Sequence, residues 1–446
     1  MSVTWLIDRM RSWENEKAII WRDSEFTYRD LLLSVDSWIS ELDIRGIQGG
    51  SVVAIEGDYS PRTCSLLLAL MLKKAIVVPL SRAIKNRRKD FLNIAEVQYI
   101  FSFDDRDSWQ EEKRGIPIKN NLLRQLIAIG EPGLVLFSSG STGENKAALH
   151  NLSKFLQKFI ARRYRLRTLI FLLFDHIGGI NTLFYTLSNG GTMVISPLRT
   201  PTAICRHIEK YKVELLPTSP SFLNLLLISE AYKGYDLSSL KKVTYGTEVM
   251  PESLLKRLHR IFPWVEFVQT YGLSELGILR SKSKYSDSLW VKVGGEGFKI
   301  KVIDGVLWIK ADAAMLGYLN APNPFDEEGW MNTGDLVEVE RDYIKILGRE
   351  SDIINVGGQK VYPAEVESVL MEMDNVINAS VRREENPITG NVVAARLTLA
   401  KPEDLSSLKK RVRKYCQARL ESYKIPVKIE VTDDVQYSGR FKKVRT

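Results

Sequence analysis

The chain has 446 residues, of which 44% are hydrophobic and 26% are charged, and its formal net charge is +9. This length predicts two or three domains rather than one compact core, and the composition is ordinary for a soluble globular protein. No apolar run approaches the roughly 18–20 residues that cross a bilayer, and charges occur too early at the N-terminus for a signal peptide, so we predict no membrane insertion.

The distribution of cysteines and charges indicates the compartment and the partners. Cys64, Cys205 and Cys416 lie far apart with no metal-binding or redox spacing, which predicts reduced thiols in a cytoplasmic protein. Basic residues are densest at 409–414 and 440–445. No zinc finger, basic zipper or aromatic-basic RNA signature accompanies them, so we predict no nucleic-acid partner. An anionic ligand such as a nucleotide or coenzyme A would also favour a basic protein.

The first 130 residues alternate between strand-like and helix-like stretches. A hairpin is predicted over 18–28 and a helix over 29–42. Strands are predicted over 51–55 and 75–79, on either side of an apolar helix over 61–74. This βαβ rhythm favours a mostly parallel sheet with helices on its faces.

The most informative stretch follows a short apolar strand predicted over 133–137. It combines hydroxyls, glycines and one lysine: Ser138, Ser139, Gly140, Ser141, Thr142, Gly143, Glu144, Asn145 and Lys146. Glycines let backbone N–H groups turn toward a ligand, hydroxyls add donors, and lysine supplies a mobile positive charge, so the stretch suits a polyphosphate. It is not a Walker A loop, because two residues separate Gly143 from Lys146. A polar surface turn is the alternative.

A buried strand predicted over 169–174 leads into a loop that contains His176. Ligands of open α/β sheets bind beyond the carboxyl ends of the strands, so His176 lies where a site is expected. A lone histidine is, however, more often structural. The alternation then continues, with strands predicted over 192–195 and 214–217 and helices over 202–212 and 221–231.

Two further predicted strands end in polar turns. One, over 243–248, ends in Gly246, Thr247 and Glu248. The other begins at 265 and leads into Tyr271, Gly272, Ser274 and Glu275. An aromatic ring can stack on a base, glycine permits a close backbone approach, a hydroxyl can bind phosphate and a carboxylate can coordinate Mg²⁺.

The sequence from 292 to 339 is strand-rich and includes the turn Thr333-Gly334-Asp335, which a type I turn alone would explain. A polar, glycine-containing segment follows over 347–367. Beyond it, the pattern predicts an α+β module with a helix over 364–373, strands over 379–383 and 392–398, and a basic helix over 405–420.

These motifs, in this order and over nearly the whole chain, resemble the adenylate-forming superfamily of acyl-CoA synthetases, amino-acid adenylation domains and luciferases. The resemblance rests on Ser-Ser-Gly-Ser-Thr-Gly-x-x-Lys at 138–146, on Tyr-Gly-x-Ser-Glu at 271–275, where the family usually has Thr in place of Ser274, and on segment 347–367. It implies an α/β fold with a large N-terminal multi-sheet domain of βαβ layering over 1–349, which binds ATP and the carboxylate, and a small mobile α+β domain over 350–446.

The resemblance also implies an activity, that of an ATP-dependent carboxylate-CoA ligase, an acid-thiol ligase. Such an enzyme uses ATP and Mg²⁺ to activate an acyl or aryl carboxylic acid as acyl-AMP and then transfers the acyl group to the thiol of coenzyme A. An acyl-AMP ligase that loads the phosphopantetheine of an acyl carrier protein is one alternative. A catalytically impaired nucleotide-binding homologue is another.

The same resemblance assigns roles to individual residues. The implied ATP-binding residues are Ser138, Ser139, Gly140, Ser141, Thr142, Gly143, Lys146, Gly246, Thr247, Glu248, Tyr271, Gly272, Asp335 and Arg349, with Asp335 on the ribose and Glu275 on Mg²⁺. The implied carboxylate pocket comprises His176, Asn181, Phe184, Thr218, Ser219, Tyr245 and Gly246. Ser351 and Asp352 would form the interdomain hinge, and Gly357 and Gly358 would line the coenzyme A channel.

The implied catalytic residues are His176, Ser274 and a cation near the C-terminus. The family usually has Gly-Lys there, but the aligned residue of this chain is Arg440. Because the planar guanidinium is not equivalent to an ammonium, we place Lys442 slightly ahead of Arg440. A merely basic tail is the alternative. Amino-acid adenylation domains carry Asp directly after the gating aromatic residue, where this chain has Ile177, so an α-amino acid substrate is less expected.

Overall fold

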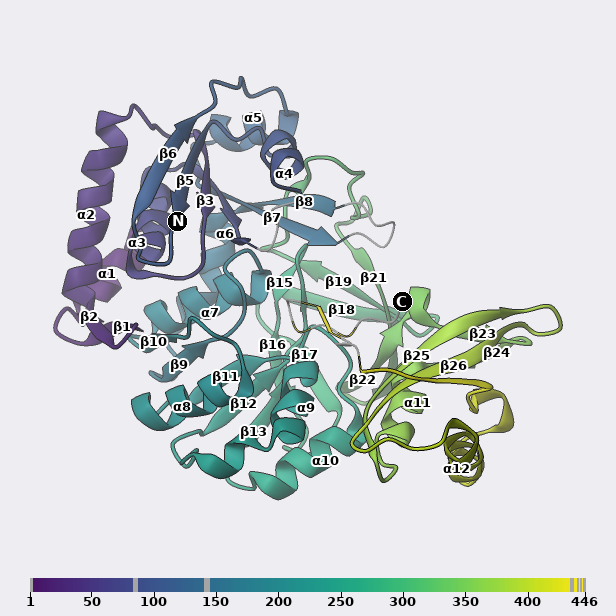
Figure 1. The fold of residues 1–446 in the computed structure, drawn as a ribbon. Coiled ribbons are helices and arrows are strands. Elements are labelled where there is room, and N and C mark those ends of the chain that lie inside the picture. The colour runs from purple at the N-terminus through teal and green to yellow at the C-terminus, as the bar shows by residue number, and fades with distance from the viewer. Residues whose placement is uncertain are drawn as a thin grey trace.

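The computed structural model describes residues 3–82, 87–139, 145–433, 437–438, 441 and 443, and gives only the backbone of Ser139 (Figure 1). The predicted roles of Gly140, Ser141, Thr142, Gly143, Arg440 and Lys442 therefore fall outside the described residues. No helix in the described ranges is long and apolar enough to cross a membrane.

A first sheet of seven strands includes both described ends of the predicted phosphate-binding stretch, at Ser138–Ser139 and Asn145–Lys146. Its order is β20-β8-β7-β4-β3-β5-β6, with parallel pairing of β5, β3, β4 and β7 and antiparallel pairing toward both edges. The strands are β3 (Val52–Glu56), β4 (Ile76–Leu80), β5 (Tyr99–Phe103), β6 (Trp109–Lys113), β7 (Gly133–Ser139), β8 (Asn145–Asn151) and β20 (Gly317–Tyr318).

Alternate residues of these strands enter two different cores. Val53 and Ile55 belong to the core that contains α2 (Tyr28–Ile44) and α3 (Pro61–Leu72). Val52 and Ala54 belong to the core on the opposite face, which contains α4 (Arg88–Ile94) and α5 (Asn121–Ala128). A strand buried on both faces reads as a continuous apolar run, which is why these strands are visible in the sequence.

A second seven-stranded sheet has the order β13-β12-β11-β9-β10-β1-β2, and only β2 is antiparallel to its neighbour. Helix α7 (Ile177–Ser188) packs with α1 (Thr4–Arg11) and α3 in the core between the two sheets. The other face is covered by α8 (Pro201–Tyr211), α9 (Pro220–Ser229) and α10 (Glu252–Ile261). The strands are β1 (Lys17–Trp21), β2 (Ser24–Thr27), β9 (Arg167–Ile170), β10 (Thr192–Ile195), β11 (Leu215–Thr218), β12 (Lys242–Tyr245) and β13 (Glu266–Gln269).

The strand-rich region forms a six-stranded antiparallel sheet of order β16-β17-β22-β21-β19-β18, preceded by the short hairpin β14–β15. Its strands are β16 (Arg280–Ser283), β17 (Trp290–Gly294), β18 (Phe298–Ile303), β19 (Val306–Ala311), β21 (Met331–Glu340) and β22 (Tyr343–Arg349). The hairpin is β14 (Gly272–Leu273) and β15 (Gly277–Ile278). Short helical segments at α6 (Leu152–Leu156), η2 (Gln157–Phe159) and η3 (Ala231–Gly234) complete this part.

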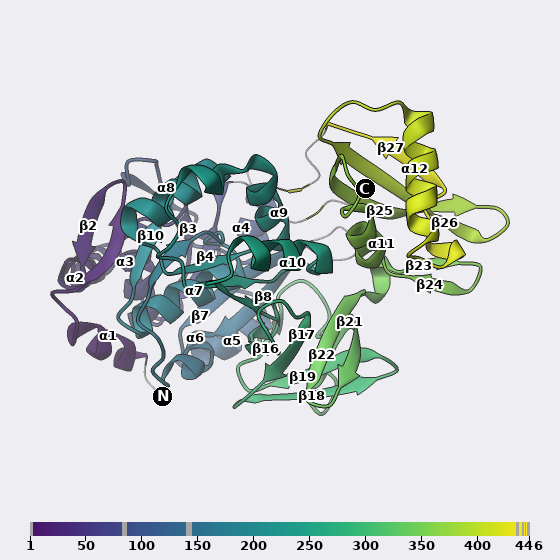
Figure 2. The same ribbon diagram turned by 90° about the horizontal axis from the view of Figure 1, so that it is seen from below.

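The C-terminal part has its own hydrophobic core, made of residues between Ile354 and Ile429, and lies beside the large part in both views (Figures 1 and 2). Its elements are η4 (Glu350–Asp352), β23 (Ile354–Val356), β24 (Gln359–Val361), α11 (Pro363–Leu370), β25 (Val376–Asn386), β26 (Gly390–Leu399), α12 (Leu405–Gln417), η5 (Ser422–Lys424) and β27 (Lys428–Val431). The predicted fold class, a large multi-sheet α/β domain followed by a small α+β domain, is thus confirmed, while the boundary at 349/350 stays a prediction.

One predicted strand is wrong in extent. The strand predicted over 169–174 is β9, which ends at Ile170, and His176 caps α7 instead of lying in an open loop. Ile170 pairs with Ile195, the last residue of β10, and Pro197 follows shortly after. Because proline cannot donate to a strand ladder, the neighbouring strand stops there, and Phe171 and Phe174 are buried as core residues outside the sheet.

Candidate active site

A cavity of ≈ 200 Å³ lies where the ends of β7, β11 and β12 meet the N-terminus of α7 and the hairpin β14–β15. The carboxyl ends of parallel strands lie at one edge of a sheet, so the residues that follow them converge. The predicted site residues that line this cavity are Ser138, His176, Asn181, Thr218, Gly246, Thr247, Gly272, Ser274, Glu275 and Arg349. Motifs that are distant in the sequence therefore share one wall.

A second cavity, of ≈ 260 Å³, adjoins the first and is bounded by the antiparallel sheet and the small domain. The two cavities have five lining residues in common: Thr247, Thr270, Gly272, Leu273 and Arg349. The second is also lined by Glu248, Tyr271, Asp335 and Asp352. Most of the residues expected to bind the nucleoside thus surround this second cavity.

Asp335 receives two donors at the wall of that cavity. The hydroxyl of Tyr271 donates to Asp335 Oδ2 at 2.5 Å, and Arg349 Nε lies 3.2 Å from Oδ1. Asp335 and Arg349 are opposite each other in the β21–β22 pairing. Burial and the neighbouring carboxylate raise the pKa of Tyr271 well above its usual value, so the phenol stays protonated and remains a donor. The carboxylate is therefore held in a fixed orientation.

Glu275 and the end of the phosphate-binding stretch meet at one tyrosine. The hydroxyl of Tyr318, on β20, donates to Glu275 Oε1, and Lys146 Nζ lies 5.3 Å from the centre of the Tyr318 ring. Strand β20 pairs with β8, which begins next to Lys146, so the sheet itself brings these residues together. A cation and a carboxylate thereby flank the same side of the site.

His150 fixes the backbone beside Glu275. Its Nε2 lies 2.7 Å from the carbonyl oxygen of Ser274, and burial lowers its pKa to about 4, so the neutral ring donates this hydrogen bond. Sequence analysis missed both His150 and Tyr318. The only available signal was the position of His150 on the strand that follows the phosphate-binding stretch.

His176 and Gly179 play different structural roles at the start of α7. His176 Nδ1 accepts a hydrogen bond from the backbone N–H of Gly178 at 3.1 Å and so caps α7, while the residue lines the first cavity. A Cβ on Gly179 would lie 2.0 Å from the carbonyl oxygen of Leu173. The His-x-x-Gly spacing thus allows the first turn of α7 to approach the backbone that precedes it.

Phe184 and Tyr245, both among the predicted pocket residues, belong to the core and line neither cavity. Phe184 is 1% exposed and packs near Phe155 and Phe159, and Tyr245 is completely buried in the core of the second sheet. Successive residues of a strand point to opposite faces, so Thr244 and Gly246 border the cavity while Tyr245 faces away. These two assignments to the pocket are corrected accordingly.

Five other predicted residues line neither cavity: Lys146, Ser219, Ser351, Gly357 and Gly358. Ser219 caps α9 by accepting from the N–H of Phe222, and its hydroxyl donates to the carbonyl oxygen of Phe441. Gly357 and Gly358 form the turn between β23 and β24, both with positive φ. Ser351 and Asp352 lie in η4, directly after β22. The channel and hinge roles stay predictions.

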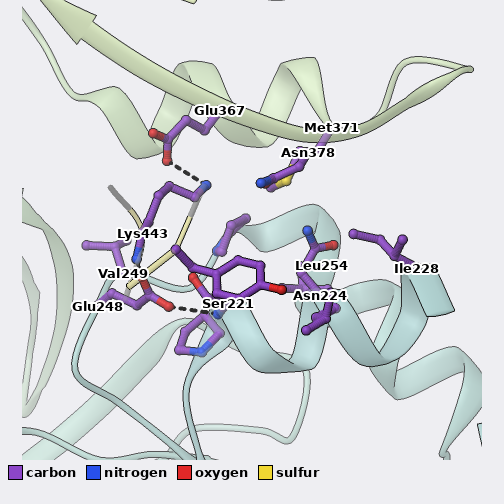
Figure 3. A pocket seen from close by; sticks show the side chains of 14 residues that line it. Ser221, Asn224, Ile228, Glu248, Val249, Leu254, Glu367, Met371, Asn378 and Lys443 are labelled. Atoms are coloured by element: carbon purple, nitrogen blue, oxygen red, sulfur yellow. Dashed lines mark hydrogen bonds and ion pairs between the residues drawn. The ribbon is translucent and has the colours of Figure 1, made fainter. Parts of the chain in front are cut away.

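The C-terminal segment connects the two parts of the molecule (Figure 3). The backbone N–H of Lys443 donates to Glu248 Oε2 at 2.9 Å, while its Nζ lies 3.1 Å from Glu367 Oε2 and 2.9 Å from the carbonyl oxygen of Ala379. Glu367 is 1% exposed. Glu248 also accepts from the N–H of Ser221 at 2.7 Å. Lys443 therefore lines the second cavity, while its ammonium pairs with Glu367 of the small domain.

The protein side chains at this site could bind Mg²⁺ only if the phosphates of a bound nucleotide supplied further ligands. No group of three or more His, Cys, Asp or Glu side chains in the described part of the chain could hold a metal by itself. Glu275 is 9% exposed and shares its cavity wall with Ser138 and Ser274. Mg²⁺ usually binds through one or two carboxylates plus substrate phosphates, so this wall fits the ion.

Comparisons with known proteins find relatives of this chain in sequence and in fold. An acyl-CoA synthetase of Caenorhabditis elegans is 30% identical over 62% of this chain, and the match spans only 54% of that relative, about half its length. The 2-succinylbenzoate–CoA ligase of Bacillus subtilis is 25% identical over 99% of this chain and 96% of its own. The solved o-succinylbenzoate CoA synthetase of Bacillus subtilis with its acyl-adenylate intermediate has the same fold, with a TM-score of 0.78, 22% identity, and coverage of 99% and 97%.

The family models cover both parts of the molecule. Residues 7–319 match the AMP-binding enzyme model and residues 365–442 match the AMP-binding enzyme C-terminal domain. Together with the shared fold, these matches identify the chain as a member of the AMP-binding enzyme family.

Proposed function

We propose that this protein is an ATP-dependent carboxylate-CoA ligase, which converts an acyl or aryl carboxylic acid to acyl-AMP and then to an acyl thioester of coenzyme A. The observation that carries the proposal is the meeting of Lys146 and Glu275 at Tyr318, next to a cavity that continues to Asp335. The names of relatives that match nearly full length support an acid-thiol ligase.

In the first half-reaction, an oxygen of the carboxylate attacks the α-phosphorus of ATP and pyrophosphate leaves. Such a displacement depends on positioned donors and cations that offset negative charge, with little covalent help from the protein. Lys146 and the stretch 138–146 would hold the β- and γ-phosphates, Asp335 the ribose hydroxyls and Tyr271 the base. Glu275 would bind Mg²⁺, which supplies positive charge to the triphosphate when bound.

The substrate carboxylate would lie in the first cavity, between His176 and Gly246. The hydroxyl of Ser274 is available on the same wall, and His150 keeps its backbone in place. This arrangement would direct the carboxylate toward the α-phosphate and exclude other orientations. Arg440 or Lys442 would add a cation there.

In the second half-reaction, the sulfur of coenzyme A attacks the acyl carbon and AMP departs with the electron pair of the C–O bond. Ser351 and Asp352 would be the hinge about which the small domain turns, bringing Gly357 and Gly358 to the pantetheine. Alternation between two domain positions lets one site serve two half-reactions. A carrier-protein phosphopantetheine is the competing acceptor.

Isotope exchange between ATP and pyrophosphate, measured across a panel of carboxylic acids, tests the proposal. We expect exchange with at least one acid, a reduction of roughly 100-fold in Glu275→Gln, and no change in Glu296→Gln, whose carboxylate is exposed in a distant turn. Coenzyme A and an acyl carrier protein are then compared as acceptors. ATP binding without exchange for any acid would show that the protein binds nucleotide but does not catalyse.

A further inference from the structure

A third cavity, of ≈ 200 Å³, continues from the cavity that would hold the substrate carboxylate. The two have six lining residues in common: Asn181, Thr182, Pro217, Thr244, Thr270 and Ile278. Beyond this shared ring, the third cavity extends between α7, β12 and the segment 158–164, where Phe159, Tyr164 and Tyr185 supply aromatic surface. Asp335 lines the second cavity but not the third.

Lys158 lines this third cavity. Its Nζ donates to Asn181 Oδ1 at 2.6 Å and to the carbonyl oxygen of Ile278 at 3.0 Å. It also lies 4.8 Å and 5.0 Å from the ring centres of Phe155 and Phe159. An ammonium has three N–H donors, so these two hydrogen bonds leave one donor without a partner among the described residues.

All the described charged residues that line the third cavity are basic. The lining includes the side chains of Lys158, Arg163, Lys242 and Arg280, and none of the described lining residues is Asp or Glu. Lys242 is paired with Glu266 at 2.8 Å, whereas Lys158 forms no ion pair with any described carboxylate. The aromatic rings and neutral oxygens around Lys158 offset its charge only in part.

An ammonium surrounded by protein without an anion is costly. Burial, and secondarily the Arg163 guanidinium, lower the pKa of Lys158 to about 7. An anion in the cavity would reverse this effect, because a nearby opposite charge favours the charged form. The position is therefore suited to a ligand that brings its own negative charge.

We propose that the third cavity receives the far end of the substrate, and that this end carries a second carboxylate which Lys158 binds. The inference rests on the proposed function and specifies its substrate class: a dicarboxylic acid of which one carboxylate is activated. Lys158 is then a specificity-determining residue, with Asn181 holding its ammonium at the junction of the two cavities. The aromatic lining favours a cyclic or aryl body between the two carboxylates.

The test compares matched substrates on the same enzyme. Phthalic, isophthalic, terephthalic, homophthalic, adipic and suberic acids, each with its neutral monoamide, are supplied in ATP–pyrophosphate exchange together with benzoic and octanoic acids. We expect at least one diacid to have a KM roughly 10- to 100-fold below that of its monoamide, the range for a hydrogen bond to a charged group. Lys158→Met should abolish this difference, whereas Lys154→Met, an exposed lysine on neighbouring α6, should preserve it.

Measuring KM as a function of pH tests the proposal on the unmodified protein, without any substitution. Because Lys158 must be protonated to bind an anion, the KM of the diacid should rise above about pH 7, by up to roughly tenfold per pH unit, while that of its monoamide stays flat. The titration of ATP or of other protein groups should change both KM values equally, so it cancels when the diacid is compared with its monoamide. The other titratable or charged groups near Lys158 are His150, Arg163, Tyr164, Tyr185, Lys242 and Arg280.

The outcomes separate the two proposals. Exchange with monocarboxylic acids or monoamides that equals or exceeds that of every diacid would overturn the dicarboxylate inference and leave the ligase function intact. A diacid preference that persists in Lys158→Met would also overturn it. No exchange with any acid would refute the ligase function itself.

Discussion

Lys146 and Glu275 contact the same side chain: the ammonium lies 5.3 Å from the centre of the Tyr318 ring, and the Tyr318 hydroxyl donates to the Glu275 carboxylate. The two residues are far apart in the sequence, and the pairing of β20 with β8 helps to bring them together. Burial and the Glu275 carboxylate raise the pKa of Tyr318, so the phenol stays protonated. Tyr318 therefore sets the spacing between a cation and an anion that would contact one triphosphate.

Tyr318→Phe should weaken the use of Mg·ATP without unfolding the protein. The ring would still carry Lys146, but Glu275 would lose its donor and its fixed orientation. We expect the KM for Mg·ATP in pyrophosphate exchange to rise roughly tenfold, the order expected for loss of a hydrogen bond to a charged group. Tyr343→Phe is the matched control, because Lys284 lies 5.7 Å from the centre of that ring, outside the cavities. Equal effects of the two variants would contradict a role for the Tyr318 hydroxyl.

Asp335→Asn should reduce nucleotide affinity. The substitution keeps the size of the side chain but removes the charge that Tyr271 and Arg349 orient. Charge-assisted hydrogen bonds are about twice as strong as neutral ones, so the Kd for ATP should rise roughly 10- to 100-fold. Calorimetry with ATP and no carboxylic acid measures this directly. Asp342→Asn, in the turn that follows β21, should bind ATP normally, since Asp342 is exposed and pairs with Lys292.

Gly179→Ala should destabilise the fold and displace α7. The new Cβ would lie 2.0 Å from the carbonyl oxygen of Leu173 and 2.7 Å from the Tyr59 hydroxyl, and the carbonyl is backbone that cannot rotate away. Overpacking of this kind costs about 1–3 kcal/mol, measurable as a lower urea midpoint. Gly234→Ala is the control, because its Cβ would meet nothing within 4 Å. A midpoint unchanged in both variants would show that α7 moves without cost.

The free energy of unfolding should decrease as the pH is lowered below about 6.5, and part of this decrease should come from His150. Its pKa is about 4 in the folded protein and about 6.5 when unfolded, so only the unfolded chain binds a proton between these values. This residue then contributes a loss of about 2 kcal/mol between pH 6.5 and pH 5, and none above pH 6.5. His150→Gln should remove that share of the loss, seen as a smaller difference between urea midpoints at pH 7 and pH 5. Parallel pH profiles for both proteins would show that His150 is accessible to protons in the folded state.

The sequence predicted the layered fold and most of the motif residues, for identifiable physical reasons. Strands such as β3 and β4 are buried on both faces and appear as continuous apolar runs. The resemblance placed Tyr245 in the pocket, but successive residues of a strand face opposite sides, and the neighbours Thr244 and Gly246 line the cavity instead. His150, Lys158 and Tyr318 carry no local signature. Each acts through a contact between residues more than 20 positions apart, which only the tertiary pairing creates.

The anchoring of Phe441 has a mechanical consequence. Its ring packs 5.2 Å from that of Phe171 and 5.5 Å from that of Phe222, in the large domain, although the chain reaches it from β27 of the small domain. The small domain is thus tethered at both of its ends, by the peptide at residue 350 and by this ring. From Val431 to Phe441 a fully extended chain reaches about 35 Å. Any reorientation that needs a greater separation must first remove the partly buried ring from these contacts, at a cost below the roughly 1.5–3 kcal/mol for a fully buried Phe side chain.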